Sequence, residues 1–376
     1  MKILFCFMGT LNPSCGGVER TMCNLIHELQ DRGHECTVVG WYRNAPYAPF
    51  SNIQKILPTG AREQRQQGFR QVMEEQAPDI IIHDGELLGA YALFPGLAGR
   101  KRLLKAFPGK APVIIDMHHS DIRGRLRAPF LKRMYYGLTW RRNFYLRIAH
   151  ADAFVVLSDS FRKDFYGFLP GVCKKKITAI PNMNSFESAS IPSGKEKEVL
   201  FVGRLDNPVK GVDRLLKIWS EVCRREPGWF LRIVGDGPDR EYLAALAQEC
   251  GCSNYSFEGS SDHPEEYYRR ASILCMTSTF EGFGMVLIEG MQHGCVPMAF
   301  ESFTAVRDII DPDRTGILVP PFDLDQYAAR LLDLMRDSGK REAMSGASFR
   351  SSRKFSKSRI TGLWEGLFSA LAETSR

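Results

Sequence analysis

The sequence has few of the features that mark a membrane-spanning or secreted protein. No run in its 376 residues approaches the roughly 20 consecutive apolar residues that a membrane-spanning helix needs. The apolar residues 1–8 are followed at once by a polar loop, and they lack the longer apolar core and the cleavage site of a signal peptide. We therefore interpret this run as a first buried strand and expect a cytoplasmic protein.

Cysteine is present but is not arranged for disulfides or zinc. The ten cysteines are scattered, no C-x-x-C occurs, and the closest two, Cys250 and Cys252, have neither disulfide nor zinc spacing. Cys6, Cys36 and Cys275 lie inside apolar segments, where a free thiol behaves as a small hydrophobic side chain. The sequence therefore predicts no disulfide framework and no metal site.

The order of apolar segments predicts an α/β fold. The chain is too long for one comfortable core, and its 44% hydrophobic and 25% charged residues are typical of a soluble globular protein. Strand and helix signals alternate, which indicates two Rossmann-like domains with parallel sheets, whose carboxyl ends meet at a central cleft. We expect these domains at 1–184 and 185–355, followed by a closing helix within 356–376. The expected strands are 3–8, 35–40, 79–83, 113–116, 153–157, 199–202, 230–234, 273–276 and 296–299, and the clearest helices are 21–32, 213–225 and 360–371.

One stretch of the N-terminal domain is strongly basic, although the net charge of the chain is only +7. Residues 121–150 fit a solvated helix with buried aromatic side chains, and they fit equally a surface that meets an anionic membrane or an acidic polymer. No nucleic-acid recognition motif accompanies the stretch, so we expect no nucleic-acid partner. The bases are Arg123, Arg125, Arg127, Lys132, Arg133, Arg141, Arg142 and Arg147, against the single acid Asp121.

The segment 277–297 carries two acids, Glu281 and Glu289, around an apolar and glycine-rich run. It follows a strand and leads into a helix, so 277–284 is a turn at the carboxyl edge of a sheet. Glycines let the backbone approach a ligand, and the first amides of the helix favour an anion such as a diphosphate. Carboxylates accept hydrogen bonds from hydroxyl groups, so the segment fits a nucleotide-sugar. The alternative makes Glu281 a helix cap and Glu289 a surface residue.

The cations that a diphosphate needs are found after an earlier strand. Arg204 follows that strand and Lys210 precedes the next helix, so both lie at the same carboxyl edge as Glu281. There they could neutralise a leaving pyrophosphate. Taken alone the pair is a weak signal, because arginine and lysine are common on protein surfaces.

The N-terminal domain contains fewer sequence signals of a binding site. Gly16 and Gly17 form a turn between the first strand and its helix, without the G-x-G-x-x-G pattern of a dinucleotide site. His118 ends a strand that faces the expected cleft. A single histidine there is more often structural, and His119 competes with it as the functional residue.

Together these segments resemble the retaining glycosyltransferases of family 4, which have the GT-B fold. The resemblance covers nearly the whole chain, and Glu281 to Glu289 match the family's E-x7-E motif, although Gly290 stands where the family usually has alanine. The other matching segments are Gly16–Arg20, Gly33–His34, His118, Gly203–Leu205, Lys210–Gly211 and Gly235–Gly237.

The resemblance implies a nucleotide-sugar donor, with UDP-hexose favoured, and no separate cofactor. In the C-terminal domain it assigns Glu289 to the ribose and Glu281 to the hydroxyls of the transferred sugar. In the N-terminal domain, Gly16 and Gly17 would close over the donor, and His118 would contact the sugar near the reacting carbon. The residues expected at the diphosphate are Arg204 and Lys210, with the backbone of Phe283, Gly284, Met285 and Val286.

The mechanism implied by the resemblance uses no protein nucleophile and no metal. The acceptor hydroxyl attacks the face from which the diphosphate leaves, and a donor phosphate oxygen takes its proton, so the protein supplies positioning and charge stabilisation. Two D-x-D sequences, 311–313 and 323–325, are typical of a turn and of a helix start. The acceptor would bind the N-terminal domain, where the stretch 121–150 favours a lipid-linked or phosphorylated glycan at the inner membrane face, such as a lipopolysaccharide core.

Three other functions fit the same fold. A non-hydrolysing sugar-nucleotide epimerase would need acid and base side chains around the donor sugar, which the sequence does not offer. A phosphorylase would need a recognisable lysine for pyridoxal phosphate. A nucleotide-sugar-binding protein without transfer activity would have no reason to keep Arg204, Lys210, Glu281 and Glu289 together.

Overall fold

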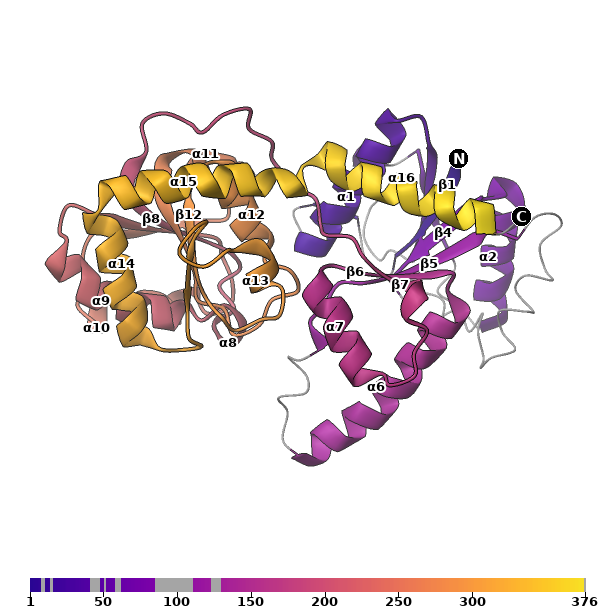
Figure 1. Cartoon of the computed structure of the whole chain (residues 1–376), viewed down its shortest axis with the longest axis horizontal. Coiled ribbons are helices and arrows are strands. Elements are labelled where there is room, and N and C mark those ends of the chain that lie inside the picture. The colour runs from indigo at the N-terminus through magenta and orange to yellow at the C-terminus, as the bar shows by residue number, and fades with distance from the viewer. Residues whose placement is uncertain are drawn as a thin grey trace. The chain divides into compact units, whose positions relative to one another are not determined.

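The computed structural model describes residues 1–7, 11–13, 16–40, 48–50, 52–57, 62–84, 111–122 and 130–374, and every structural statement below concerns these residues. The chain divides into two compact units (Figure 1). Unit 1 comprises Met1–Ser185 together with Lys357–Arg376, and unit 2 comprises Phe186–Ser356. The C-terminal segment thus belongs to the same unit as the N-terminus.

Unit 1 contains a parallel sheet in the order β3-β2-β1-β4-β5-β6-β7. Its strands are β1 (Lys2–Cys6), β2 (Glu35–Gly40), β3 (Gln54–Ile56), β4 (Ile80–His83), β5 (Val113–His118), β6 (Ala153–Val156) and β7 (Ile177–Ala179). Its helices are α1 (Gly17–Asp31), α2 (Arg62–Gln76), α6 (Phe130–His150), α7 (Asp159–Phe168) and α16 (Lys357–Thr374), with 3₁₀ turns η1 (Ala48–Phe50) and η2 (Lys174–Lys176).

Both faces of this sheet are buried. Ile3 and Phe5 of β1 join a core cluster with α1 and α16, whereas Leu4 and Cys6 join a second cluster with α2. Alternate residues of a strand point to opposite faces, so a strand covered on both sides becomes a continuous apolar run. This explains why residues 2–6 have the appearance of a buried strand in the sequence.

Unit 2 repeats the arrangement with a parallel sheet in the order β10-β9-β8-β11-β12-β13. Its strands are β8 (Glu196–Val202), β9 (Phe230–Val234), β10 (Tyr255–Gly259), β11 (Ala271–Met276), β12 (Val296–Phe300) and β13 (Ile317–Val319). Its helices are α8 (Asn207–Lys210), α9 (Val212–Arg225), α10 (Arg240–Glu249), α11 (Glu265–Arg270), α12 (Met285–Gln292), α13 (Val306–Ile309), α14 (Leu324–Arg336) and α15 (Ser338–Ser352), followed by η3 (Arg353–Phe355).

The strand order locates the ligand-binding edge of each unit. In unit 1 the order reverses between β1 and β4, and in unit 2 it reverses between β8 and β11. Open parallel sheets bind ligands outside the carboxyl ends of the strands at such a switch point. The prediction of an α/β fold with two Rossmann-like units is therefore confirmed.

Candidate functional site

The carboxyl edge of unit 2 is built around the turn between β11 and α12. Gly284 is the N-cap of α12 and has φ of 93°, a left-handed conformation that glycine adopts without a Cβ clash. Because glycine has no side chain, no capping hydrogen bond covers the first turn of the helix. Phe283 and Gly284 are buried, while Met285 and Val286 are partly exposed. The helix therefore begins at the sheet edge without a side-chain cap, as a helix that binds an anion would.

Lys210 and Ser278 both bind the first acid of the motif, Glu281. The Lys210 Nζ lies 2.7 Å from Oε1 of Glu281, and the Ser278 hydroxyl donates to the same oxygen at 2.6 Å. No described residue donates a hydrogen bond to the other oxygen, Oε2. The side chains of Lys210 and Glu281 are 25% and 11% exposed, whereas Ser278 is only 1% exposed. The structure thus brings together the lysine and the glutamate that the sequence assigned to neighbouring parts of a ligand.

The loop that carries Lys210 is fastened to this turn by its backbone. The amide of Thr279 donates to the carbonyl of Val209 at 2.8 Å, and the Thr277 hydroxyl donates to the carbonyl of Lys210 at 3.3 Å. Gly211, with φ of 60°, lies so close that an added Cβ would be 2.5 Å from the carbonyl oxygen of Thr277. Only glycine allows this approach.

Arg214, which sequence reasoning missed, holds the same turn from α9. Its Nη1 donates to the carbonyl of Thr277 and its Nη2 donates to the hydroxyl of Thr279, each at 3.0 Å. Its guanidinium also lies over the ring of Phe322, 4.5 Å from the centroid. No motif position marked Arg214, because its role depends on contacts between α9 and a turn more than 60 residues away.

Arg204 follows β8 at the same edge. The residue is exposed, and no hydrogen bond or ion pair joins its guanidinium to another described residue. The preceding loop packs backbone to backbone against the loop after β9. A Cβ at Gly235, whose φ is 136°, would lie 1.9 Å from the carbonyl oxygen of Gly203. The Leu205 amide donates to the carbonyl of Asp236 at 2.9 Å.

The second acid of the motif, Glu289, lies inside unit 2 and is only 1% exposed. The hydroxyl of Tyr268 on α11 lies 2.9 Å from its Oε2. The Nδ1 atom of His293 lies 2.9 Å from the backbone carbonyl oxygen of Glu289. Glu289 is thus not the surface residue of the alternative interpretation, and its assignment to a ribose stays a prediction.

In unit 1, Gly16 and Gly17 begin α1. Gly16 is the N-cap in an extended conformation, and the carbonyl of Gly16 accepts from the amide of Arg20 at 3.1 Å. A Cβ at Gly16 would lie 2.6 Å from a carboxylate oxygen of Glu19, a flexible side chain. The two glycines therefore lie at the start of α1, the helix that follows β1, and their contact with a donor stays a prediction.

The two candidate histidines of unit 1 have different surroundings. The His118 ring packs between three phenylalanine rings, with centroids at 5.0 Å for Phe144, 5.4 Å for Phe165 and 6.3 Å for Phe154. Both ring nitrogens of His119 are buried and have no hydrogen-bond partner among the described residues. Burial, helped by the positive charge of nearby Arg147, lowers the pKa of His119 to about 4. His118 thus resembles a core histidine, and His119 stays an open candidate.

Beside these histidines, Arg147 of the basic stretch is an internal cation. Its Nε and Nη2 donate to the two oxygens of Asp116, at 2.9 and 2.6 Å, and Asp116 is fully buried. Burial lowers the pKa of His83 to about 4, although the carboxylate of Asp116, 3.8 Å away, acts in the opposite direction. Of the basic stretch, Arg141 and Arg142 are exposed on α6. Arg123, Arg125, Arg127 and the side chains of Lys132 and Arg133 lie outside the described residues.

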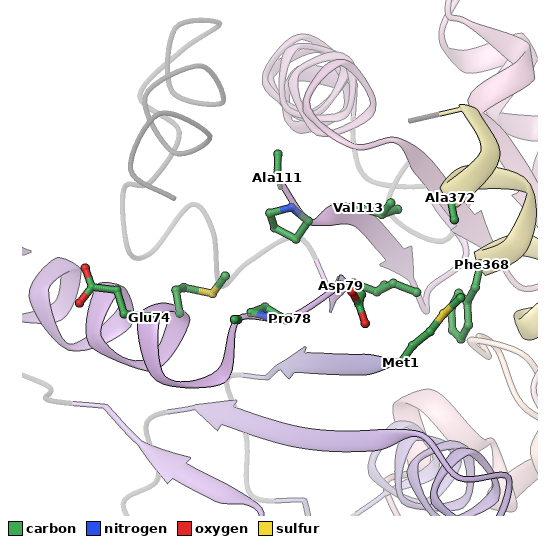
Figure 2. Close-up of a pocket in the computed structure, with 12 residues that line it drawn as sticks. Met1, Glu74, Pro78, Asp79, Ala111, Val113, Phe368 and Ala372 are labelled. Carbon is green, nitrogen blue, oxygen red and sulfur yellow. The ribbon is translucent and has the colours of Figure 1, made fainter. Parts of the chain in front are cut away.

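A cavity of about 380 Å³ lies elsewhere in unit 1, at the amino ends of β1, β4 and β5 (Figure 2). Its lining includes Met1, Asp79, Val113 and Phe368. Since ligands of open parallel sheets bind at the carboxyl ends of strands, this cavity is at the wrong edge for the predicted donor.

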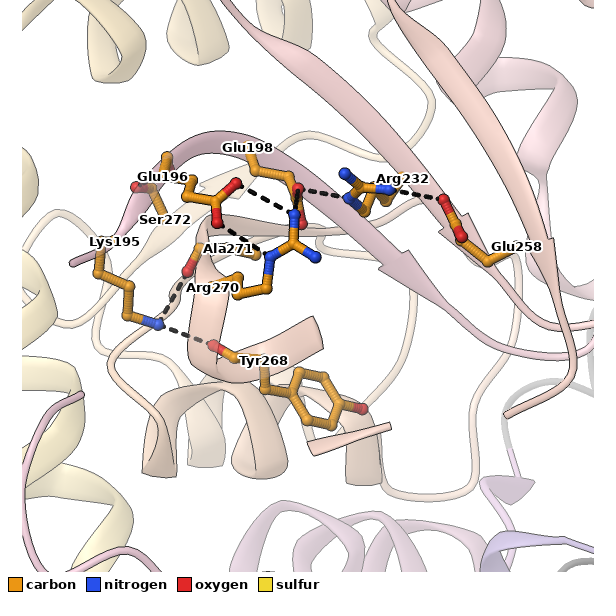
Figure 3. Close-up of polar contacts among 9 residues, drawn as sticks. All are labelled: Lys195, Glu196, Glu198, Arg232, Glu258, Tyr268, Arg270, Ala271 and Ser272. Atoms are coloured by element: carbon orange, nitrogen blue, oxygen red, sulfur yellow. Dashed lines mark hydrogen bonds and ion pairs between the residues drawn. The ribbon is translucent and has the colours of Figure 1, made fainter. Parts of the chain in front are cut away.

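A charged cluster joins three strands of unit 2 to α11 (Figure 3). Arg232 lies between Glu198, at 2.5 Å, and Glu258, at 2.7 Å. Arg270 binds both oxygens of Glu196, at 3.0 and 3.1 Å. Each arginine of this cluster is already paired with carboxylates, so we interpret the cluster as a brace across β8, β9 and β10 that offers no cation to a ligand.

The two D-x-D sequences have structural contacts. Asp323 is the N-cap of α14 and accepts from the amide of Gln326 at 2.9 Å. Asp313 has φ of 61° in a turn and pairs with Arg330. Within the described ranges, no group of three or more histidine, cysteine or acidic side chains is placed to hold a metal ion.

The geometry defines an α/β protein with two Rossmann-like units, one of which sets a carboxylate, a lysine and a helix N-terminus at its ligand-binding edge. Residues 15–183 match the family described as Glycosyltransferase Family 4, and residues 184–350 match that described as Glycosyl transferases group 1. The two matches together span residues 15–350, so the chain consists of glycosyltransferase domains of these two descriptions, as its motifs predicted.

Two relatives are transferases of different kinds. An exopolysaccharide phosphotransferase of Streptomyces coelicolor is 31% identical over 278 residues, which span 72% of this chain but only 28% of that longer protein. A lipopolysaccharide 1,6-galactosyltransferase of Salmonella typhimurium is 25% identical over 352 residues, or 88% of this chain and 89% of its own length.

Solved structures confirm the GT-B fold. The apo form of the lipopolysaccharide outer core galactosyltransferase WaaB has a TM-score of 0.74 and 22% identity, covering 98% of this chain and 100% of its own. Anabaena Alr3699/HepE in complex with UDP has a TM-score of 0.78 and 18% identity, with coverages of 98% and 100%. The protein is thus a GT-B glycosyltransferase related to transferases of lipopolysaccharide cores and cell-surface glycans. Within the part of the chain that the structure describes, no helix combines the length and apolar composition needed to cross a bilayer.

Proposed function

We propose that the protein is a retaining hexosyltransferase that moves a hexose from UDP-hexose to a hydroxyl of a glycan or lipid-linked acceptor. The contact between Lys210 and Glu281 at the start of α12 carries the proposal. In a nucleotide-sugar the diphosphate is bonded directly to the hexose, so an anion and a set of hydroxyls lie side by side. An ammonium group beside a carboxylate is complementary to that pair of groups.

The remaining donor contacts follow from the same edge. Arg204 is exposed and engages no described side chain, which leaves its five N–H donors for phosphate oxygens. The amides of residues 283–286 would lie beside the same diphosphate. Glu289 would hold the ribose. The complex of the structural neighbour HepE with UDP supports uracil as the base.

The proposed chemistry exchanges one bond at the anomeric carbon. The bond from this carbon to the diphosphate oxygen breaks, and a bond to the acceptor oxygen forms on the same face. The acceptor's proton passes to a phosphate oxygen of the departing UDP. The protein supplies no nucleophile and no metal in this scheme. Arg204, Lys210 and the amides of α12 stabilise the negative charge of the leaving group, which is where electrostatic preorganisation contributes most.

For the acceptor we propose a lipopolysaccharide core or another cell-surface oligosaccharide, on the strength of the Salmonella galactosyltransferase. Unit 1 would bind it, with His118 or His119 near the reacting carbon. Arg141 and Arg142 on α6 are exposed, and we propose that they meet anionic lipid or a phosphorylated acceptor at the inner membrane face.

Thermal denaturation against UDP-, GDP- and ADP-hexoses tests the donor. A ligand at 100 times its dissociation constant stabilises the fold by roughly 2.7 kcal/mol, so the midpoint should rise with UDP-hexose and with neither of the others. Glu281→Ala and Glu289→Ala should reduce the shift. Incubation of UDP-hexose without acceptor should leave the sugar unchanged, whereas an epimerase would convert it. The absence of a shift with every nucleotide-sugar would remove the donor site.

A further inference from the structure

We propose that Ser278 is a positioning residue that prepares Glu281 for the transferred sugar. Its hydroxyl shares Oε1 of Glu281 with Lys210, so that Oε2 remains available to accept hydrogen bonds from sugar hydroxyls. The proposal rests on the proposed function and extends it to a residue outside the two glutamates of the motif.

The geometry around the carboxylate is asymmetric. Both donors, the Ser278 hydroxyl at 2.6 Å and the Lys210 Nζ at 2.7 Å, reach Oε1, and no described residue donates to Oε2. Each carboxylate oxygen has two lone pairs, so these donors satisfy Oε1 and fix the plane of the group. The sugar would then meet an oxygen whose position is set before binding.

Ser278 is itself held firmly. It is 1% exposed, and its carbonyl accepts a hydrogen bond from the hydroxyl of Ser302 at 2.6 Å. A serine side chain has a single χ angle that points the oxygen, so ordering it costs little entropy. A donor fixed in this way contributes preorganisation, which raises affinity by reducing the cost of binding.

The two donors differ in what they do when UDP-hexose arrives. Lys210 is 25% exposed at its side chain, and its ammonium would be attracted to the diphosphate, so part of its hold on Glu281 is lost on binding. The hydroxyl of Ser278 is too buried to reach a ligand and retains Glu281 as its acceptor. Ser278 is therefore the donor that keeps the carboxylate in place in the bound state.

The test compares two ligands on one variant, UDP and UDP-hexose, by calorimetric titration. UDP lacks the sugar, so the ratio of its dissociation constant to that of UDP-hexose isolates the sugar contacts. UDP-glucose and UDP-galactose are both titrated into the wild-type protein. The one that binds more tightly is then used as the UDP-hexose in every ratio. Ser278→Ala should lower this ratio about tenfold, the loss expected for one hydrogen bond to a charged group, and leave the affinity for UDP unchanged.

Ser352→Ala is the matched control. Ser352 is fully buried, and its hydroxyl donates to Oε1 of Gln292 at 2.7 Å, away from Glu281. The control loses an equally buried hydrogen bond between side chains and should keep the wild-type ratio. Ser278→Cys provides a second, nearly isosteric variant with a weak donor, and it should lower the ratio in the same direction.

A double-mutant cycle shows whether Ser278 acts through Glu281. If it does, the double variant Ser278→Ala/Glu281→Ala should have the same ratio of dissociation constants as Glu281→Ala alone. Additive losses, or an unchanged ratio in Ser278→Ala or Ser278→Cys, would overturn the positioning role. If wild-type protein binds no UDP, or Glu281→Ala leaves the ratio unchanged, the proposed function fails first and this proposal falls with it.

Discussion

The hydroxyl of Tyr268 donates a hydrogen bond to Oε2 of Glu289 at 2.9 Å, and both residues are buried. The ring of His293 stacks on that of Tyr268, with centroids 5.9 Å apart and planes 20° apart. The second glutamate of the E-x7-E motif is thus oriented from α11, a helix that precedes the motif in the chain. The orientation of the Glu289 carboxylate therefore depends on the packing of α11 against α12 as well as on α12 itself.

Tyr268→Phe should therefore weaken the contact with ribose. The substitution leaves Oε2 without a donor that it has in the native protein, and we expect a loss of about 1–2 kcal/mol in the free energy of unfolding. If Glu289 holds the ribose, the preference for UDP over 2′-deoxy-UDP should also fall several-fold. Denaturant titration and calorimetry measure the two effects.

Tyr327→Phe separates the two effects. Tyr327 is fully buried and donates to the carbonyl of Met298 at 2.7 Å, so its substitution costs a comparable hydrogen bond. We expect reduced stability with an unchanged preference for UDP. A Tyr268→Phe variant that behaved in the same way would show that Glu289 has a structural role and does not contact ribose.

The central strands were predictable from the sequence because each is buried on both faces and forms an apolar run. Predicted residues 35–40 coincide with β2, and predicted 273–276 lie within β11. The strands β3, β7, β10 and β13 were missed. All four lie at the sheet edges. β3, β7 and β13 have only three residues each, and all five residues of β10 are partly exposed, so none of these strands forms a long buried apolar run.

The site was predictable only in part. Glu281 and Lys210 were both predicted at one sheet edge, and the register of parallel strands brings them together. Ser278 and Arg214 were not, because a serine or an arginine carries no signal until its partner is known. The departure at Gly290 also has a packing reason. An alanine methyl there would lie 2.6 Å from Cδ2 of Leu274, which fills the space.

Arg204→Met should weaken UDP binding by about tenfold or more and leave uridine binding unchanged. The guanidinium of Arg204 pairs with no described residue, so its removal leaves no internal carboxylate unpaired, and the variant loses only the phosphate contacts. Arg240→Met is the control, because Arg240 is an exposed arginine of the same unit that pairs with Asp236 at 3.4 Å. Equal UDP affinity in both variants would contradict a diphosphate contact for Arg204.

The stability of the protein should fall as the pH drops from about 6.5 to 5. Burial lowers the pKa of His83 and of His119 to about 4 in the folded chain. Below pH 6.5 the unfolded chain binds protons at both residues while the folded chain does not, so acid favours unfolding. The free energy of unfolding should fall by roughly 1.4 kcal/mol per pH unit for each histidine. Urea titrations at pH 7.5, 6 and 5 measure the slope.

His83→Asn should reduce the dependence of the free energy of unfolding on pH by the contribution of one histidine. A wild-type stability that is flat between pH 6.5 and 5 would mean that both histidines gain their protons in the folded state.

Charge reversal at Arg141 and Arg142 tests the membrane contact. Both are exposed on α6, and each basic side chain near an anionic surface contributes about 1 kcal/mol, so Arg141→Glu/Arg142→Glu should reduce binding to phosphatidylglycerol vesicles by tenfold or more. Arg224→Glu/Arg225→Glu on α9 makes the same change in net charge on exposed residues of unit 2 and should bind as wild type does. High salt should abolish the difference between wild type and the α6 variant, because salt shortens the Debye length, the distance over which the membrane charge attracts the arginines. Equal sedimentation of wild type and the α6 variant with vesicles would remove the membrane from the proposal. The two arginines would then be expected to contact phosphate groups of the acceptor. In that case the same variant should have a higher KM for the acceptor than the wild-type protein.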